Sequence, residues 1–179
     1  MVIGIIIGVV LLVILGWIIG TSNRLNRLNV KIDEAESGID VALTKRYDVL
    51  TKMVDTVKGY AKHEKELLLG SIQLRKGMTI QEKNEANAQM DQTMGRINAL
   101  AENYPDLKAN TNFEKLQTSI ADVEEHLQAA RRLYNANVST LNQMIVTFPA
   151  SIIANAKGTK KREFFEAETH KKDDVKIEF

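Results

Sequence analysis

Residues 1–20, MVIGIIIGVVLLVILGWIIG, contain no charged side chain and no Asn, Gln, Ser or Thr. A helix rises about 1.5 Å per residue, so this run spans roughly 30 Å, the thickness of the hydrocarbon core of a bilayer. A buried core helix is the alternative, but an uninterrupted apolar run of this length favours the membrane. The stretch therefore predicts a transmembrane anchor and makes the lipid bilayer the first expected partner of the chain.

The flanks of this run favour a retained anchor over a cleaved signal peptide. No Lys or Arg precedes the run, and no small-residue cleavage site follows it. Trp17 lies near its far end, where aromatic rings prefer the lipid–water interface, and Arg24 and Arg27 follow closely. The positive-inside rule then predicts a single-pass protein with its N-terminus outside and the rest of the chain in the cytoplasm.

The glycines of the anchor are regularly spaced. Gly4 and Gly8 form one GxxxG pair, and Gly16 and Gly20 form another. Small residues at this spacing let membrane helices approach closely, so one interpretation is a self-association surface. The other is that glycine is simply common in membrane helices, and the sequence leaves both open.

The composition of the chain limits the classes of function and fold. Charged residues make up 26% of the 179 residues and the net charge is +1, so nothing predicts nucleic-acid binding. Two prolines and 6% aromatic residues fit long helices better than sheets. The chain has no cysteine, which excludes disulfides, thiolate metal sites and thiol nucleophiles.

An apolar seam with alternating steps of three and four predicts one amphipathic, coiled-coil-like helix over residues 25–69. Whether this helix continues the anchor or is separated from it by a polar hinge at residues 21–23 stays open. The seam residues are Leu25, Leu28, Ile32, Ala35, Ile39, Ala42, Arg46, Val49, Met53, Thr56 and Tyr60.

Two further helices are each predicted to begin with a capping box, at residues 79–82 (TIQE) and 111–114 (TNFE). Pro105 ends the first of them and Pro149 ends the second. Short links between long helices favour antiparallel neighbours, so residues 21–149 are predicted to form an up-and-down bundle. The seam of the last helix is Phe113, Leu116, Ile120, Val123, Leu127, Ala130, Tyr134, Val138, Leu141, Ile145 and Phe148.

The periodic pattern fails in residues 150–179, which are expected to form a C-terminal tail. Residues 163–167 (EFFEA) are compatible with one short helix, with Phe164 and Phe165 docking on the bundle or on lipid. The charged end, residues 169–179, is expected to be loosely held unless a neighbouring subunit binds it.

Several polar residues interrupt the seams or flank them. One interpretation is register control, in which a buried polar group is satisfied by a carboxylate across the bundle, namely Asp40, Asp48 or Glu124. The other is a subunit contact or partner site, and the first is favoured. The residues concerned are Arg46, Arg131, Arg132 and Tyr134.

No pattern predicts catalysis. His63-Glu64 begins like an HExxH zinc motif, but Leu67 stands where the second histidine is needed. No histidine has a glutamate three residues before it, and no glycine-rich phosphate loop is present. We therefore expect no enzyme activity, cofactor or metal site.

Several blocks of the sequence together resemble the LemA family. They are RYD at 46–48, TVKGYAKHE at 56–64, YPDLKAN at 104–110, ARRLYN at 130–135, Asn142, FP at 148–149, EFFE at 163–166 and VKIEF at 175–179. The resemblance runs in order from the anchor to the last residue. Val41 and Leu43 stand where some members carry polar residues.

The resemblance implies a bacterial protein of the inner membrane, with a short exterior end and a cytoplasmic antiparallel helical bundle. No catalytic activity is established for the family. Its genes often neighbour membrane-bound metallopeptidases of the heat-shock type. The first hypothesis is thus a non-enzymatic scaffold that forms homo-oligomers at the envelope, and the alternative is an adaptor or regulatory subunit of such a metallopeptidase.

Overall fold

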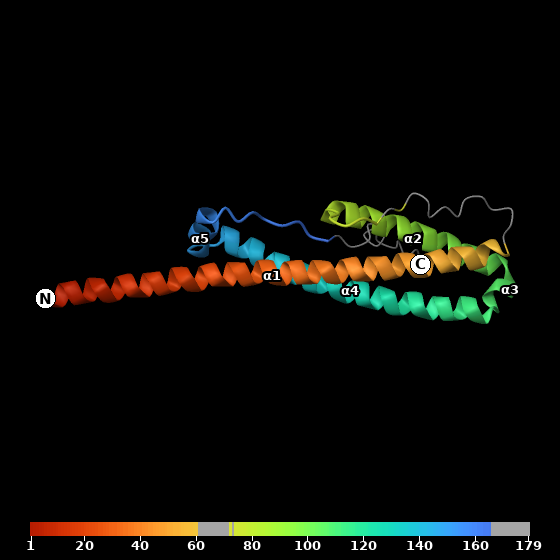
Figure 1. Ribbon diagram of the computed structural model, residues 1–179, viewed down its shortest axis with the longest axis horizontal. Helices are drawn as coiled ribbons and strands as arrows, with labels where there is room; N and C mark the ends of the chain where they lie inside the picture. Colours follow the sequence, from red (N-terminus) through yellow and green to blue (C-terminus); the bar gives the residue numbers. More distant parts are fainter. Residues whose placement is uncertain (61–71, 73, 166–179) are drawn as a thin grey trace, which may run out of the picture. The chain divides into compact units, whose positions relative to one another are not determined.

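The computed structural model describes residues 1–60, 72 and 74–165 (Figure 1). These residues form helices and no strand, which confirms the predicted all-α class. In chain order the helices are α1 (Val2–Lys58), α2 (Ile80–Asn103), α3 (Pro105–Lys108), α4 (Thr111–Val146) and α5 (Ala150–Ala156).

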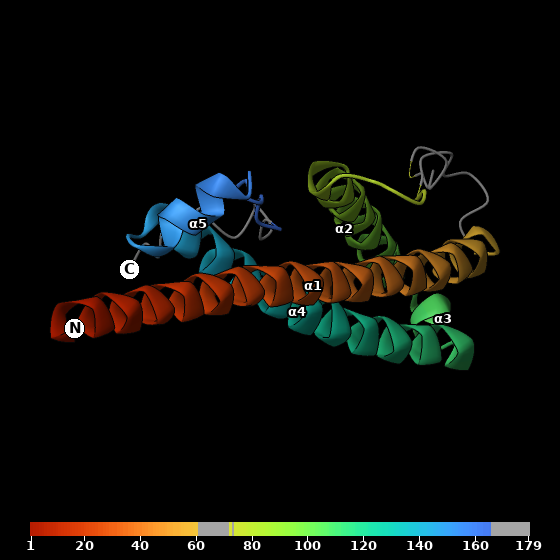
Figure 2. The ribbon, with the colours of Figure 1, turned by 60° about the vertical axis from the view of Figure 1, so that its left-hand side comes forward.

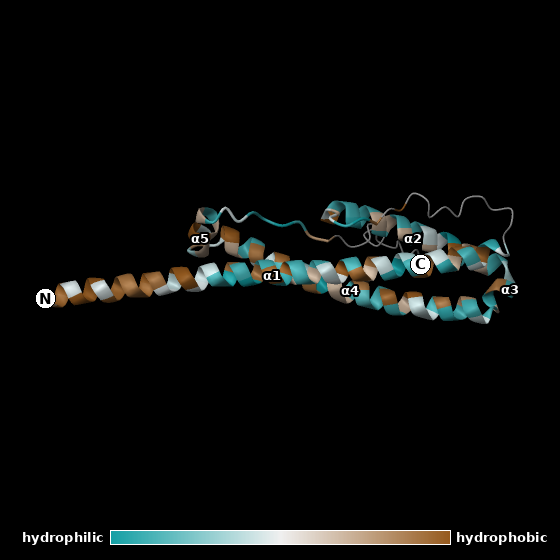
Figure 3. Ribbon diagram, viewed as in Figure 1, coloured by the Kyte–Doolittle hydropathy of each residue, from teal (hydrophilic) through white to brown (hydrophobic). Residues whose placement is uncertain are grey.

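Helix α1 is continuous across the polar residues 21–23, so the anchor and the first bundle helix are one element and no hinge separates them. Its apolar end is exposed throughout, and the most apolar 18-residue window has a mean hydropathy of 3.2 with none of it buried (Figure 3). Among the described residues, α1 is the one helix long and apolar enough to cross a membrane.

The far end of α1 differs from the prediction. The helix ends at Lys58, and the amides of Gly59 and Tyr60 close tighter turns onto the carbonyls of Thr56 and Val57. The predicted helix is therefore wrong for residues 59–60. Its remainder, with His63 and Glu64, lies outside the described residues.

The chain divides into two compact units. Unit 1 consists of Met1–Glu36 and Arg132–Phe164, and unit 2 consists of Ser37–Arg131 together with Phe165, the last described residue. Helices α1 and α4 contribute residues to both units. Helices α2 and α3 belong to unit 2, whereas α5 belongs to unit 1, and Figure 2 shows these elements from a second direction.

Unit 2 has an apolar core built from α1, α2, α3 and α4. Its buried side chains include Leu50, Met53, Val54, Val57, Ala86, Met90, Ile97, Leu100, Ala101, Leu107, Phe113 and Ile120. On α1 the predicted seam positions Val49 and Thr56 are not buried, whereas Leu50 and Val57 are, and the predicted seam position Tyr60 is exposed beyond the end of the helix. A strict three–four alternation has a period of 3.5, and a straight helix with 3.6 residues per turn drifts away from it by about 20° per heptad.

The first capping box is confirmed. The amide of Glu82 donates to Thr79 Oγ1 at 3.2 Å, and the amide of Thr79 donates to Glu82 Oε2 at 2.7 Å. The backbone hydrogen bond from Thr79, together with Arg75, lowers the pKa of Glu82.

The second capping box is wrong. Asn110, one residue before the predicted cap, accepts hydrogen bonds through Oδ1 from the amides of Asn112 at 2.9 Å and Phe113 at 3.2 Å. Asparagine stabilises a helix at the N-cap position as well as threonine does. Here Asn110 occupies that position, and its side chain accepts from amides of the first turn.

Unit 1 departs most from the prediction. The C-terminal part of α4 buries Tyr134, Val138, Leu141 and Met144, but Phe148 at the end of the predicted seam is 77% exposed. Helix α5 then follows, where the sequence indicated only a tail. The described residues 163–165 are extended, so the predicted short helix is wrong there, and 166–167 lie outside the described residues.

Candidate functional site

The most buried charge of unit 2 is Arg46 on α1. Its side chain is 3% exposed and lies among groups from α2 and α4. It forms ion pairs with Asp91 and with Glu124 Oε1 (2.6 Å), and Nη1 donates to Asn87 Oδ1 at 2.7 Å. Its Nε has no hydrogen-bond partner within the described structure. Glu124 was one of the three carboxylates expected from the sequence, while Asp91 and Asn87 were missed because they lie on the weakly patterned helix α2.

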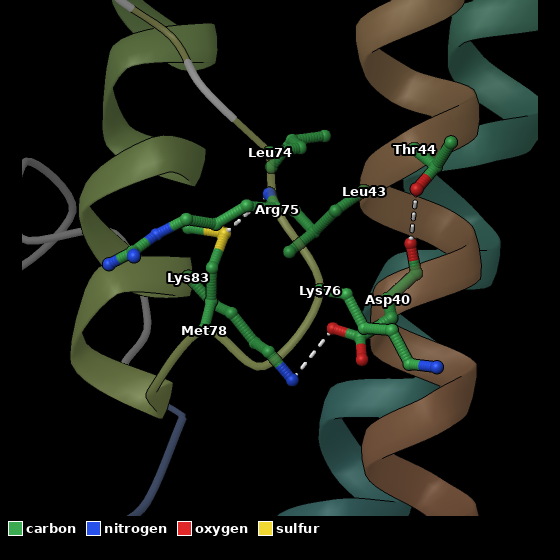
Figure 4. A pocket seen from close by; sticks show the side chains of 8 residues that line it. All are labelled: Asp40, Leu43, Thr44, Leu74, Arg75, Lys76, Met78 and Lys83. Carbon is green, nitrogen blue, oxygen red and sulfur yellow. Dashed lines mark hydrogen bonds and ion pairs between the residues drawn. The ribbon is translucent and has the colours of Figure 1, made fainter.

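A second buried cation of unit 2 is Lys83, whose Nζ lies 2.7 Å from Asp40 Oδ1. Burial of Lys83 was not predicted from the sequence, because a lysine in a polar helix is usually solvated. Asp40, which was proposed as a partner of Arg46, is thus engaged by Lys83 (Figure 4).

Beside this pair lies a cavity of about 290 Å³, lined by residues of α1, α2 and the loop between them. Three of its charged lining residues form ion pairs: Lys83 pairs with Asp40, and Arg75 pairs with Glu82. The hydroxyl of Thr44 donates to the carbonyl of Asp40 at 2.8 Å, and the amide of Arg75 faces Met78 Sδ (Figure 4). The pair between Arg75 and Glu82 holds the loop onto α2, and the pair between Lys83 and Asp40 joins α2 to α1.

Unit 1 is held together by polar side chains that bind an extended backbone. Asn142 on α4 donates through Nδ2 to the carbonyl of Arg162 and accepts through Oδ1 from its amide, both at 2.9 Å. The hydroxyl of the buried Tyr134 donates to the carbonyl of Glu163 at 3.0 Å. An extended segment outside a sheet has no ladder partner, so these side chains supply the hydrogen bonds that its backbone needs.

The side chain of Arg162 fixes the same segment to α1. Its Nη2 lies 2.9 Å from Asp33 Oδ1, and Nη1 lies 3.8 Å from Glu36 Oε2. Burial, and then the negative charge of Glu36, raise the pKa of Tyr134 to about 12, with Arg162 opposing the shift. Tyr134 is therefore a neutral hydrogen-bond donor at physiological pH.

The remaining predicted contact residues have different surroundings. The guanidinium of Arg131 lies 4.9 Å from the ring centroid of Phe165, a cation–π arrangement that covers the buried Phe165. Phe164 and Arg132 are exposed. Of the two tail phenylalanines predicted to dock, one is thus buried and the other faces outward.

The predicted anchor is a stretch of α1 whose side chains are exposed throughout. Nothing lies within 4 Å of a Cβ built at Gly4, Gly8, Gly16 or Gly20, so this surface is open. Trp17, Arg24 and Arg27 are likewise exposed, in chain order from the apolar run to the first polar turns.

The described residues define a class of protein: a membrane-associated helical protein whose buried cations, Arg46 and Lys83, form ion pairs within unit 2. Within these residues no three His, Asp or Glu side chains are grouped so that they could hold a metal ion. A model of the LemA family matches residues 35–179. The chain belongs to the LemA family.

The comparison with individual relatives agrees with this assignment. Protein LemA of Metamycoplasma hominis is 31% identical over 162 residues, which cover 88% of this chain and 74% of that protein. Magnetosome protein MamQ of Magnetospirillum gryphiswaldense is 31% identical over 72 residues, 40% of this chain and 26% of that protein. Magnetosome protein MamQ 2 of Paramagnetospirillum magneticum is 32% identical over 73 residues, 41% and 27% of the two chains. None of these relatives carries the name of an enzyme.

Proposed function

We propose that this protein is a non-enzymatic, single-pass scaffold of the bacterial inner membrane that assembles into homo-oligomers. The observation that carries the proposal is the apolar end of α1, which is exposed along its whole length in a helix that continues without a break into the folded units. In water such a surface would aggregate, whereas in a bilayer it is the stable state.

The open glycine surface supports assembly within the membrane. In lipid, helices gain nothing from burying apolar surface against each other, and close backbone contact over small residues is a main source of association. Gly8 and Gly16 lie on the same slowly drifting face, and the space beside each is empty.

Crosslinking of the full-length chain in membranes tests this. Gly8→Ile with Gly16→Ile should lower the crosslinked oligomer severalfold, because two bulky side chains hold the helices apart. Val10→Ile with Ile14→Leu, on a different face of the helix, is the matched control and should leave crosslinking unchanged. Equal crosslinking in all three chains would contradict assembly through the glycine surface.

The size of the purified chain in mild detergent separates scaffold from adaptor. A large, homogeneous particle from the chain alone supports self-assembly. A chain that is monomeric alone and forms a larger particle only when a membrane metallopeptidase is added would overturn the scaffold role and favour the adaptor role.

The orientation is proposed to be N-terminus outside and units 1 and 2 in the cytoplasm, because basic residues follow the anchor. The chain has no cysteine, so Val41→Cys gives a single reporter at an exposed position. A membrane-impermeant maleimide should label it only after the cells are opened. If the maleimide labelled the cysteine of this variant in intact cells without an outer membrane, this orientation would be wrong.

A further inference from the structure

Helix α5 lies beside α1 immediately after the apolar run, within unit 1 (Figures 1 and 2). Lys157, at the C-terminal end of α5, donates through Nζ to Ser22 Oγ at 2.8 Å and to Asn26 Oδ1 at 2.7 Å. Ser22 is only two residues beyond Gly20, which corresponds to about 3 Å along a helix axis. If residues 1–20 span the bilayer, α5 is held at the level of its surface.

The residues before and within α5 expose large apolar side chains. Phe148 is 77% exposed and Ile152 is 55% exposed, with Val146 close by in the chain and also exposed. Elsewhere in unit 1, outside the apolar run, the other exposed large apolar side chains are Val30, Leu133 and Phe164, and these are far apart in the chain. Exposed apolar side chains gathered in one short segment mark a binding surface.

Along residues 1–32 and 147–162 the charged side chains are all basic, and the first carboxylates beyond these ranges are Asp33 and Glu163. These two ranges contain seven basic residues, and only Arg162 among them is engaged with the carboxylates of Asp33 and Glu36. The exposed basic side chains are Arg24, Arg27, Lys31, Lys157, Lys160 and Lys161.

We propose that α5 is a second membrane contact, in which Phe148 and Ile152 enter the headgroup region while Lys160 and Lys161 bind the phosphates of anionic lipids. Apolar side chains flanked by lysines are the pattern of segments that lie in a membrane interface. A second copy of this chain fits less well, because it would bring the same positive charges together. This inference rests on the proposed function, since the anchor must place α5 at the membrane.

The test uses full-length Ile152→Cys, labelled with an environment-sensitive fluorophore and reconstituted into vesicles of phosphatidylcholine with phosphatidylglycerol. The quencher is a lipid carrying a spin label at its headgroup. Val41→Cys is the matched control, because Val41 has a similar exposed fraction of 53% but lies on α1 about 30 Å beyond Gly20. The Ile152 probe should be blue-shifted and strongly quenched, and the Val41 probe should not.

Trp17 separates failure of this inference from failure of the anchor. It is the chain's only tryptophan, so its quenching in the unlabelled protein reports the anchor alone. If Trp17 is quenched and the Ile152 probe is not, α5 does not contact lipid and the inference is overturned. If Trp17 is not quenched, the proposed anchor itself is wrong, and the inference falls with it. A blue-shifted but unquenched Ile152 probe indicates cover by protein and also overturns it.

The anionic partner is tested by Lys160→Gln with Lys161→Gln in the same labelled chain. Each lysine near an anionic surface should contribute about fivefold to the docked population, so the double variant should lose quenching in phosphatidylglycerol vesicles. Pure phosphatidylcholine should weaken quenching of the unsubstituted probe to a similar extent. Quenching that is equal in all of these cases would contradict the recognition of headgroup charge.

Discussion

Units 1 and 2 draw on the same two long helices but differ in what completes them. Unit 2 adds the helices α2 and α3, which satisfy their own backbone and contribute side chains to an apolar core. Unit 1 adds α5 and an extended segment, whose backbone is satisfied by Asn142 and Tyr134. In unit 2 the buried polar side chains pair with each other. In unit 1 polar side chains make the hydrogen bonds to extended backbone that a neighbouring strand would make in a sheet.

The largest effect is expected at Arg46. Arg46→Ala removes the guanidinium that pairs with both Asp91 and Glu124, and should lower the free energy of unfolding by about 3–5 kcal/mol. Chemical denaturation of the full-length protein in detergent, followed by circular dichroism, measures this.

The control replaces the three charged residues and the amide bonded to them, with Arg46→Met, Asn87→Leu, Asp91→Leu and Glu124→Leu together. Apolar replacement of a complete buried ion cluster is often neutral or stabilising. If the single variant were as stable as the natural chain, the cluster would contribute nothing to unit 2.

The next effect is expected at Asn142 in unit 1. Asn142→Ala removes both hydrogen bonds to Arg162, and should destabilise the protein by about 2 kcal/mol. It should also speed hydrogen exchange at the Arg162 amide. Asn137→Ala is the control, because Asn137 makes only a long, exposed hydrogen bond of 3.4 Å to the carbonyl of Lys31. Unchanged exchange at Arg162 would show that its backbone does not depend on Asn142.

A smaller effect distinguishes the observed cap of α4 from the predicted one. Asn110→Ala should cost about 1 kcal/mol, because two amides of the first turn lose their acceptor. Thr111→Ala should cost almost nothing, since Thr111 is exposed and already helical. Thermal melting of both variants decides between them, and the reverse order would restore the capping box predicted from the sequence.

The smallest effect is a pH dependence in unit 1. The pKa of Tyr134 is raised to about 12 from 10.0, so the folded protein keeps this proton in a range where the unfolded chain loses it. Its contribution to stability is present below about pH 10 and is lost as the pH rises towards 12. Tyr134→Phe should therefore differ less from the natural chain at about pH 11 than at about pH 9. Denaturation at both pH values measures this, with Tyr60→Phe as the control; a constant difference would contradict it.

The sequence predicts unit 2 better than unit 1, because periodic apolar helices leave a pattern in the sequence and hydrogen bonds from side chains to extended backbone do not. Long helices with strong apolar spacing were predictable, as was the capping box at Thr79. A carboxylate partner for Arg46 was also predictable, with Glu124 as one of three candidates. The register of α1 drifted because a period of 3.5 was applied to a straight helix. Helix α5 and the extended segment carry no periodic signal. The segment is held by Asn142 and Tyr134, and α5 is held by the contacts of Lys157 with Ser22 and Asn26, which no local pattern predicts.

Unit 1 joins segments that are synthesised at very different times. Residues 25–36 of α1 and the part of α4 from Arg132 onward are separated by Ser37–Arg131, which is 95 residues. At about 5–20 residues per second, a ribosome needs roughly 5 to 20 s to make that stretch. During this interval Leu25, Leu28 and Ile32, buried in the finished protein, have no cover from their later partners. Newly made chains held in lipid at high density are therefore expected to pair through this surface before folding is complete, and faster synthesis of the intervening stretch shortens that interval.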